Sequence, residues 1–276
     1  MTSSPRPAAL ATIHGKEAIF AEPLRAVGFD VRAVTLDTDA FGTFAGEKAR
    51  VGSAREVVVK KAQAALAQAQ LPIGLASEGT FSAHPAVPYL TINYELAAFV
   101  DVEEDVVVIG DAAKVSATPA PITITYCDET VLEQIATWFP WQGAIVVDRT
   151  CKPIKVFAKG CTDENSFRRA VQNAFASGAN EIVIEPDLRA HCCADRRDVI
   201  ALAVADLCTR LTSYCPACGQ RGFGKATTKG GLPCQLCELP TTQIAAEIWK
   251  CPKCETEVEL PRPGFADPTY CDRCNP

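Results

Sequence analysis

The chain has 276 residues, of which 48% are hydrophobic and 22% are charged, and its formal net charge is −6. This length fits a domain of about 200 residues with a small appendage, and the hydrophobic content is enough for a packed core. The acidic balance argues against a protein that binds the phosphate backbone of nucleic acids, because such proteins usually carry a basic surface. No apolar run approaches the roughly 20 residues needed to span a bilayer, and no signal peptide is recognisable at Met1–Pro7.

Strands and helices are predicted to alternate from residue 8 to residue 211, which favours a layered α/β fold with a mixed, mostly parallel sheet. The predicted strands are Ala8–Ile13, Asp30–Thr35, Ile73–Ser77, Glu95–Asp101, Val106–Gly110, Ile122–Cys127, Ala144–Asp148, Ile154–Ala158 and Glu181–Glu185. The predicted helices are Lys16–Val27, Ser53–Gln70, Glu129–Trp138, Ser166–Ser177 and Asp195–Leu211. Ser53 and Glu56 have the spacing of a capping box at the start of the second helix. We therefore expect an α/β domain over residues 1–211 and a smaller domain over residues 212–276.

The smaller domain is marked by four Cys-x-x-Cys pairs. They are Cys215/Cys218, Cys234/Cys237, Cys251/Cys254 and Cys271/Cys274. Fifteen residues separate the first two pairs and sixteen separate the last two, which matches the spacing of a four-thiolate zinc site. The absence of a recognisable signal peptide favours reduced thiols in the cytoplasm over disulfides. The sequence therefore predicts a double zinc ribbon that holds two structural zinc ions.

The spacing leaves the pairing of the four knuckles open. Sequential pairing would join the first with the second and the third with the fourth, whereas cross-braced pairing would join the first with the third and the second with the fourth. Gln243–Lys250 and Glu255–Leu260 flank the third knuckle like the arms of a hairpin, which suits a ribbon. Four-cysteine sites are usually closed and structural, and redox sensing or metal transfer is the alternative. Because no linker follows Leu211, we expect the ribbon to be docked or stiffly attached.

Polar clusters follow several predicted strands, where ligands bind in open α/β sheets. Thr12, His14, Gly15 and Lys16 open the first helix, and a helix N-terminus with a nearby lysine is a natural anion site. A solvent-facing lysine in a first helical turn is the alternative. The loop over residues 37–52 contains Asp37, Asp39 and Thr43 among glycines. Its composition is typical of a loop that contacts phosphate or metal, and a simple connector is the alternative.

Two further clusters complete this set. Ser77, Glu78 and Gly79 come at the predicted end of the third strand, before a predicted loop from Glu78 to Pro88. A carboxylate next to a glycine there suits a metal ligand or general base. Asp187 and Arg189 follow the last predicted strand. These residues form the predicted ligand-binding and catalytic set.

The chain resembles an uncharacterised bacterial family of unknown function that ends in a double zinc ribbon. The segments that carry this resemblance are His14-Gly15-Lys16-Glu17, Asp37-Thr38-Asp39, Gly42-Thr43-Phe44, Gly46-Glu47, Ala76-Ser77-Glu78-Gly79, His84-Pro85, Asp187-Leu188-Arg189-Ala190 and Cys271-Asp272-Arg273-Cys274-Asn275-Pro276. The family tends to follow the Arg-Ala segment with Asn-Pro-Thr-Arg, of which only Arg196 is present here. The resemblance covers nearly the whole chain and implies no reaction.

Residues 8–101 are also similar, more remotely, to the inosine triphosphate pyrophosphatase-like superfamily. The resemblance rests on the order of strands and helices, on Thr12-x-His14-x-Lys16, on Lys61-Ala62 and on Ser77-Glu78-Gly79. It implies hydrolysis of nucleoside triphosphates with Mg²⁺. In that case Thr12, His14 and Lys16 would cradle phosphate, Glu78 would ligate the metal and Lys61 would neutralise charge. His14 stands where the superfamily has an asparagine.

These observations give two functional hypotheses. The first is a cytoplasmic hydrolase of a nucleotide or other phosphoanhydride, with Lys16 and backbone N–H groups on phosphate and Glu78 with Asp37 or Asp39 on Mg²⁺ or Mn²⁺. The second is a binding or adaptor protein that senses a small anion and docks a protein partner through its zinc ribbons. Nucleic acid is disfavoured as a partner because the ribbon has seven basic and seven acidic residues, to which eight thiolates and two zinc ions would add a charge of −4.

Overall fold

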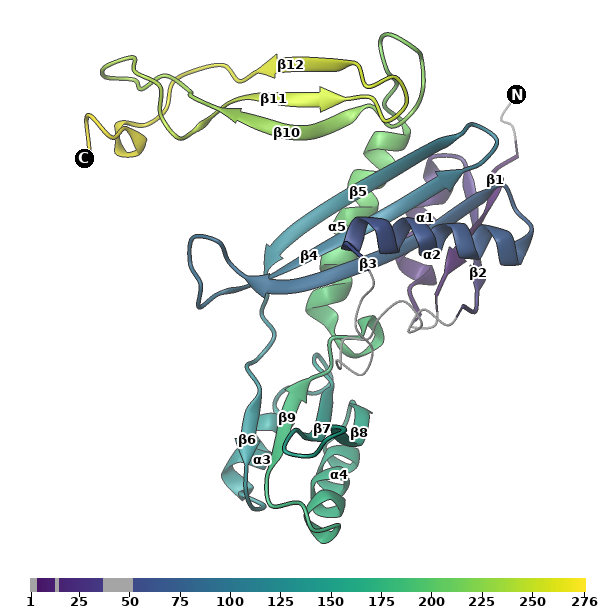
Figure 1. Cartoon of the computed structure of the whole chain (residues 1–276), viewed down its shortest axis with the longest axis vertical. Helices are drawn as coiled ribbons and strands as arrows, with labels where there is room; N and C mark the ends of the chain where they lie inside the picture. Colours follow the sequence, from purple (N-terminus) through teal and green to yellow (C-terminus); the bar gives the residue numbers. More distant parts are fainter. Residues whose placement is uncertain (1–3, 13–14, 37–51) are drawn as a thin grey trace.

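The computed structural model describes residues 4–12, 15–36 and 52–276, and it arranges the chain around three sheets (Figure 1). The largest sheet has five strands in the order β2-β1-β3-β4-β5. Its strands are β1 (Arg6–Ala11), β2 (Phe29–Val34), β3 (Ile73–Ala83), β4 (Thr91–Asp101) and β5 (Val106–Val115). β1 is parallel to both β2 and β3, whereas β3, β4 and β5 form an antiparallel meander. The predicted mixed α/β fold is therefore confirmed, with two parallel and two antiparallel strand pairings in this sheet where mostly parallel pairing was predicted.

Helices cover both faces of this sheet because its strands alternate apolar side chains between two cores. On one face, Leu10 and Phe99 pack with residues of α1 (Glu17–Ala26) and α5 (Ala194–Leu211). On the other face, Ala9 and Ala98 pack with residues of α2 (Ala54–Ala69). The predicted capping box starts α2: the hydroxyl of Ser53 accepts the backbone N–H of Glu56 at 3.2 Å.

A four-stranded sheet in the order β6-β9-β7-β8 has a core of its own. Its strands are β6 (Ile122–Ile124), β7 (Ala144–Asp148), β8 (Lys155–Cys161) and β9 (Ile182–Pro186), and its helices are α3 (Glu129–Ala136) and α4 (Glu164–Ala176). After β9, the short helix η2 (Ala190–Cys192) leads into α5, which returns the chain to the five-stranded sheet (Figure 1). The four-stranded sheet is antiparallel throughout.

The last sheet, in the order β10-β11-β12, belongs to the ribbon. Its strands are β10 (Gly224–Gly230), β11 (Ile244–Lys250) and β12 (Glu257–Pro261), followed by the short helix η3 (Pro268–Tyr270). β11 and β12 are the predicted hairpin arms around the third knuckle, and they pair antiparallel. The ribbon is docked, as expected: Arg221 donates to Glu104 at 3.0 Å, and Lys253 pairs with Asp105 at 3.0 Å.

The predicted end of the third strand is wrong, and the predicted strand Ile122–Cys127 already ends at Ile124. The third strand does not end at Ser77, and Glu78 does not begin a loop, because β3 continues to Ala83. Every residue of β3 up to Ala83 pairs with β4, so the backbone hydrogen bonds of the hairpin hold this polar stretch extended. Glu78 therefore lies inside a strand. Glu78 nevertheless lies close to the carboxyl end of the neighbouring strand β1, which ends at Ala11.

Candidate functional site

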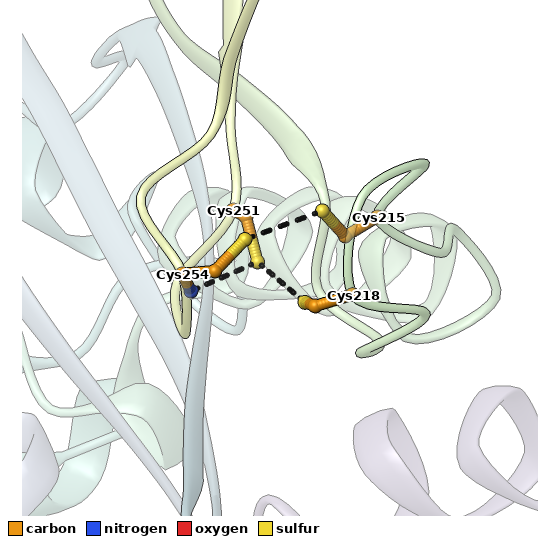
Figure 2. A group of neighbouring side chains, drawn as sticks. All are labelled: Cys215, Cys218, Cys251 and Cys254. Atoms are coloured by element: carbon orange, nitrogen blue, oxygen red, sulfur yellow. Dashed lines mark hydrogen bonds between the residues drawn. The ribbon is translucent and has the colours of Figure 1, made fainter.

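Two groups of four cysteines lie at opposite ends of the ribbon sheet. Cys215, Cys218, Cys251 and Cys254 form the first group, shown in Figure 2, and Cys234, Cys237, Cys271 and Cys274 form the second. In the first group, the sulfurs of Cys215 and Cys254 are 3.6 Å apart, and those of Cys218 and Cys251 are 3.7 Å apart. In the second group the corresponding distances are 3.9 Å and 3.6 Å.

These distances fit tetrahedral zinc. A Zn–S bond of about 2.3 Å places the sulfurs of a regular tetrahedron about 3.8 Å apart. All fourteen cysteines are free thiols, so no disulfide competes for the sulfurs. The two groups could therefore hold two zinc ions, as predicted. Among the described residues, no other group of three or more His, Cys, Asp or Glu side chains has its ligand atoms close enough together to hold a metal ion.

The pairing that the spacing left open is cross-braced: the first knuckle meets the third and the second meets the fourth. The reason is the antiparallel pairing of β10 with β11, which places Gly224 opposite Lys250. The first knuckle directly precedes this end of β10, and the third directly follows this end of β11. The seven residues of β10 span about 20 Å at 3.3 Å per residue and hold the two groups apart at the two ends of the strand.

The knuckles are turns that aim backbone N–H groups at sulfur. The N–H groups of Ala217, Leu236 and Lys253 each lie 3.4 Å from the first sulfur of their knuckle. Such donors stabilise thiolate charge next to a metal. The residue after the second cysteine has a positive φ at Gly219 and Glu255, which lets the chain reverse.

A cluster of cationic side chains lies at the carboxyl end of β1, beside β3. Open α/β sheets bind ligands in a crevice at such a position, and we call this place the crevice. From the end of β1 the chain passes through α1 to β2, on one side of β1 in the sheet. From the end of β3 it passes to β4, on the other side. The direction of the connections therefore changes between β1 and β3, which makes this the topological switch point of the sheet. Lys16 is the N-cap of α1, and its Nζ donates to the hydroxyl of Ser77 at 2.9 Å. The hydroxyl of Thr12 lies 3.4 Å from the backbone nitrogen of Lys16. The structure thus brings together three of the predicted residues.

Two buried ion pairs flank Lys16 on the two faces of the sheet. On the α2 face, Nζ of Lys61 lies 2.6 Å from Oε2 of Glu78. On the α5 face, Nε of Arg196 donates to Oε1 of Glu95 at 2.7 Å. Glu95 is fully buried, and its carboxyl group lies across Gly79, where a side chain would collide with it. Three cations therefore face two carboxylates around the end of β1.

The pKa of Lys16 is lowered to about 7. Burial is the main cause, the positive charges of Arg196 and Lys61 add to it, and the carboxylates of Glu95 and Glu78 oppose it. A lysine with this pKa changes its charge near neutral pH. An anion bound beside it would restore the charged form.

Sequence reasoning missed Glu95 as a member of this cluster, and it also missed the buried Asn93, two residues before it in β4. In β4, Asn93 and Glu95 share a face with Ala97 and Phe99, and this face packs against α5. Both polar side chains are fully buried, and the amide of Asn93 has no hydrogen-bond partner among the described residues. The sequence did contain a signal: these two polar residues occupy alternate positions of a strand, on the same face as its buried apolar residues.

The family to which the chain belongs is shown by the match of residues 61–276 to the domain of unknown function DUF6671. The chain is a member of the DUF6671 family. No curated protein and no solved structure matches it. The similarity of the N-terminal part to the inosine triphosphate pyrophosphatase-like superfamily therefore stays a prediction.

The DUF6671 match begins at Lys61 and includes Glu78, Glu95, Arg196 and the eight knuckle cysteines, whereas Lys16 lies before it. Asp187 and Arg189 are also inside the match, and they pair with each other after β9, with Nη2 of Arg189 2.5 Å from Oδ2 of Asp187. Burial raises the pKa of Asp187, but the hydrogen bonds from Arg189 outweigh it and leave the pKa below its ordinary value.

Several predicted site residues lie apart from the crevice or outside the description. His14, Asp37, Asp39 and Thr43 lie outside the described residues. Gly15 is exposed and has a φ of +64°, so it shapes the turn before α1. The turn that contains Asp187 and Arg189 is tied to the crevice through Arg196, which donates to the carbonyl of Leu188 at 2.7 Å. No helix among the described residues is both long and apolar enough to cross a lipid bilayer.

Proposed function

We propose that the α/β part of this DUF6671 protein binds a small phosphorylated molecule in the crevice between β1 and β3 and hydrolyses its phosphoanhydride bond with Mg²⁺ or Mn²⁺. The observation that carries the proposal is the convergence of Lys16, Lys61 and Arg196 at the end of β1, beside only two described carboxylates. A surplus of positive charge next to a helix N-terminus suits a phosphate group.

The Lys61–Glu78 pair suggests how metal and phosphate would enter together. Both side chains are buried, so each charge needs a partner at every stage. A metal–phosphate unit placed between them would offer a phosphate oxygen to Lys61 and a cation to Glu78. Neither buried charge would then lose its partner. Asp37 or Asp39 would complete the metal ligands in this proposal.

Lys16 would act on the same phosphate. Its pKa of about 7 means that much of it is neutral at neutral pH, and an incoming phosphate would draw a proton onto it. Catalysis would then consist of positioning and charge neutralisation, which is the main protein contribution in phosphoryl transfer. The zinc centres have no part in this reaction because their four positions are filled by cysteines.

The test is release of phosphate or pyrophosphate by the zinc-loaded full chain, with Mg²⁺ or Mn²⁺, from nucleoside triphosphates, diphosphates and inorganic tripolyphosphate. Glu78→Gln should lower the rate about 100-fold or more, the scale expected for loss of a general base or metal position. Glu133→Gln is the matched control because Glu133 is exposed on α3, which belongs to the part of the chain with the four-stranded sheet. Absence of turnover across the panel would refute the hydrolase proposal.

The second candidate is an anion-sensing protein that binds the same ligand without turnover. It is favoured by one observation: Glu78 and Glu95, the two described carboxylates of the crevice, are each paired with a cation. Calorimetric binding of tripolyphosphate that is lost in Lys16→Met, without hydrolysis by the wild type, would support this candidate. A protein partner docked on the zinc ribbons would then carry the signal.

A further inference from the structure

The two ends of the ribbon, each with one cysteine group, have the same backbone structure. We call them the first end and the second end, after the first and second groups. In the first end, the N–H of Cys215 donates to the carbonyl of Gln220 at 2.8 Å. In the second end, the N–H of Cys234 donates to the carbonyl of Leu239 at 2.9 Å. Leu239 therefore stands in the place of Gln220.

Two further positions can be matched between the ends. An isolated antiparallel bridge closes each leading knuckle, Tyr214–Arg221 in the first end and Pro233–Pro240 in the second, so Pro240 stands in the place of Arg221. The later knuckles read Cys-Pro-Lys-Cys over 251–254 and Cys-Asp-Arg-Cys over 271–274, which puts Arg273 in the place of Lys253. The two ends can thus be compared residue by residue.

The first end binds an acidic reverse turn of the same chain, the connection between β4 and β5. Nε2 of Gln220 and Nε of Arg221 donate to Oε2 of Glu104, at 3.2 Å and 3.0 Å. Nζ of Lys253 donates to the carbonyls of Glu104 and Asp105, at 3.2 Å and 3.1 Å, and to Oδ2 of Asp105 at 3.0 Å. The matched positions are therefore the ones that recognise this turn.

The second end offers the same positions without an occupant. Figure 1 shows this end of the ribbon, where the chain terminates, projecting away from the other sheets. Arg273 is exposed and has no hydrogen-bond or ion-pair partner among the described residues. Leu239 and Pro240 are exposed, and Leu236 within the leading knuckle is 72% exposed. The second end is thus a bare counterpart of a surface that is covered in the first end.

The differences between the two ends define what the second end would select. Arg273 keeps the positive charge of Lys253, so an acidic residue in the place of Asp105 would still find a partner. Leu239 and Pro240 replace the two donors that hold the carboxylate of Glu104. A carboxylate buried against them would lack hydrogen bonds, so an apolar residue is favoured there.

We infer that the second end of the ribbon docks a reverse turn of another protein, with an acidic residue in the place of Asp105 and an apolar residue directly before it. The thiolates do not exclude an acidic residue, because the first end holds two beside the same number of cysteines. A second copy of this chain does not offer such a turn, since its own first end covers it. The inference does not depend on the crevice or on hydrolysis.

The test uses two disulfide-closed peptides that copy residues 101–106, one unchanged and one with Glu104→Leu. Fluorescence polarisation on the zinc-loaded full chain should show at least about tenfold tighter binding of the Glu104→Leu peptide, which corresponds to about 1.4 kcal/mol. Arg273→Glu in the protein should weaken that binding at least about tenfold. Arg169→Glu, exposed on α4, is the matched control and should have no effect. Atomic emission should find two zinc ions in every variant.

A specificity exchange tests the comparison of the two ends directly. Leu239→Gln with Pro240→Arg gives the second end the donors of the first, and both residues are exposed, so the fold should tolerate the change. The variant should prefer the unchanged peptide. The inference is overturned if neither peptide binds saturably up to about 1 mM, if both bind wild type equally, if Arg273→Glu has no effect, or if the exchange leaves the preference as it was. A dimer of the chain that is lost in Arg273→Glu, seen by sedimentation, would also overturn it, because a second copy would then be the occupant.

Discussion

Replacing Gly79 with alanine should destabilise the protein strongly, although the backbone there is ordinary. Gly79 lies opposite Glu95 in the β3–β4 pairing. A Cβ on Gly79 would lie 2.5 Å from Oε2 of Glu95 and closer still to Cδ and Oε1, whereas real Cβ contacts essentially never fall below 3.0 Å. The carboxyl group would have to move.

The size of the effect follows from what holds that carboxyl group. Glu95 is fully buried and is bonded to Arg196 at 2.7 Å, so it cannot swing into water. Overpacking a core costs about 1–3 kcal/mol, and breaking a buried ion pair costs about 3–5 kcal/mol. Gly79→Ala overpacks the core and also weakens the Glu95–Arg196 ion pair. We therefore expect the free energy of unfolding to fall by about 3 kcal/mol.

Urea unfolding followed by far-UV circular dichroism measures this loss. Gly230→Ala is the matched control, because a Cβ there would lie 3.8 Å from its nearest neighbour, and its effect should stay within about 0.5 kcal/mol. In the background Glu95→Ala with Arg196→Met, most of the cost of Gly79→Ala should disappear. If Gly79→Ala costs no more than Gly230→Ala, or if its cost persists in that background, the steric account is refuted.

Two further predictions concern the metal centres and Lys16. Cys215→Ser with Cys251→Ser should leave one zinc per chain by atomic emission, whereas Cys215→Ser with Cys234→Ser should damage both centres and leave fewer; sequential pairing would reverse this order. Lys16 should make stability rise with pH between about 7 and 10.5, because in that window the unfolded chain holds a proton on this lysine that the folded chain does not. The free energy of unfolding of the wild type, relative to Lys16→Met, should increase across this window, and parallel curves would contradict the lowered pKa.

Much of the architecture is legible in the sequence because it is encoded locally. The spacing of the cysteines is enough to predict the four knuckles. Ser53 and Glu56 mark the start of α2 because the hydrogen bonds of a capping box join residues three positions apart. The polar stretch of β3 was misjudged because its extended form is imposed by β4. Gly79 within it looks like a loop residue until Glu95 is placed opposite.

Only some residues of the crevice could be predicted, because the others are brought together by contacts between distant parts of the chain. Lys16 and Ser77 were found because polar residues next to strand ends are a local signal. Arg196 and Glu95 are separated by 101 positions in the chain, and only packing of α5 on β4 brings them together. The pairing of the knuckles likewise depends on β10 lying antiparallel to β11, which the cysteine spacing does not encode.

Cross-bracing also sets when the ribbon can acquire metal during protein synthesis. With sequential pairing, the first centre could close as soon as Cys237 had left the ribosome. In the observed pairing, Cys215 and Cys218 must wait for Cys251 and Cys254, while two more thiols emerge in between. The α/β part would complete its strands and α5 before the first zinc ion is fully ligated in either pairing. Cross-bracing adds a stage in which the four thiols of the first two knuckles are exposed together and wait for the third knuckle.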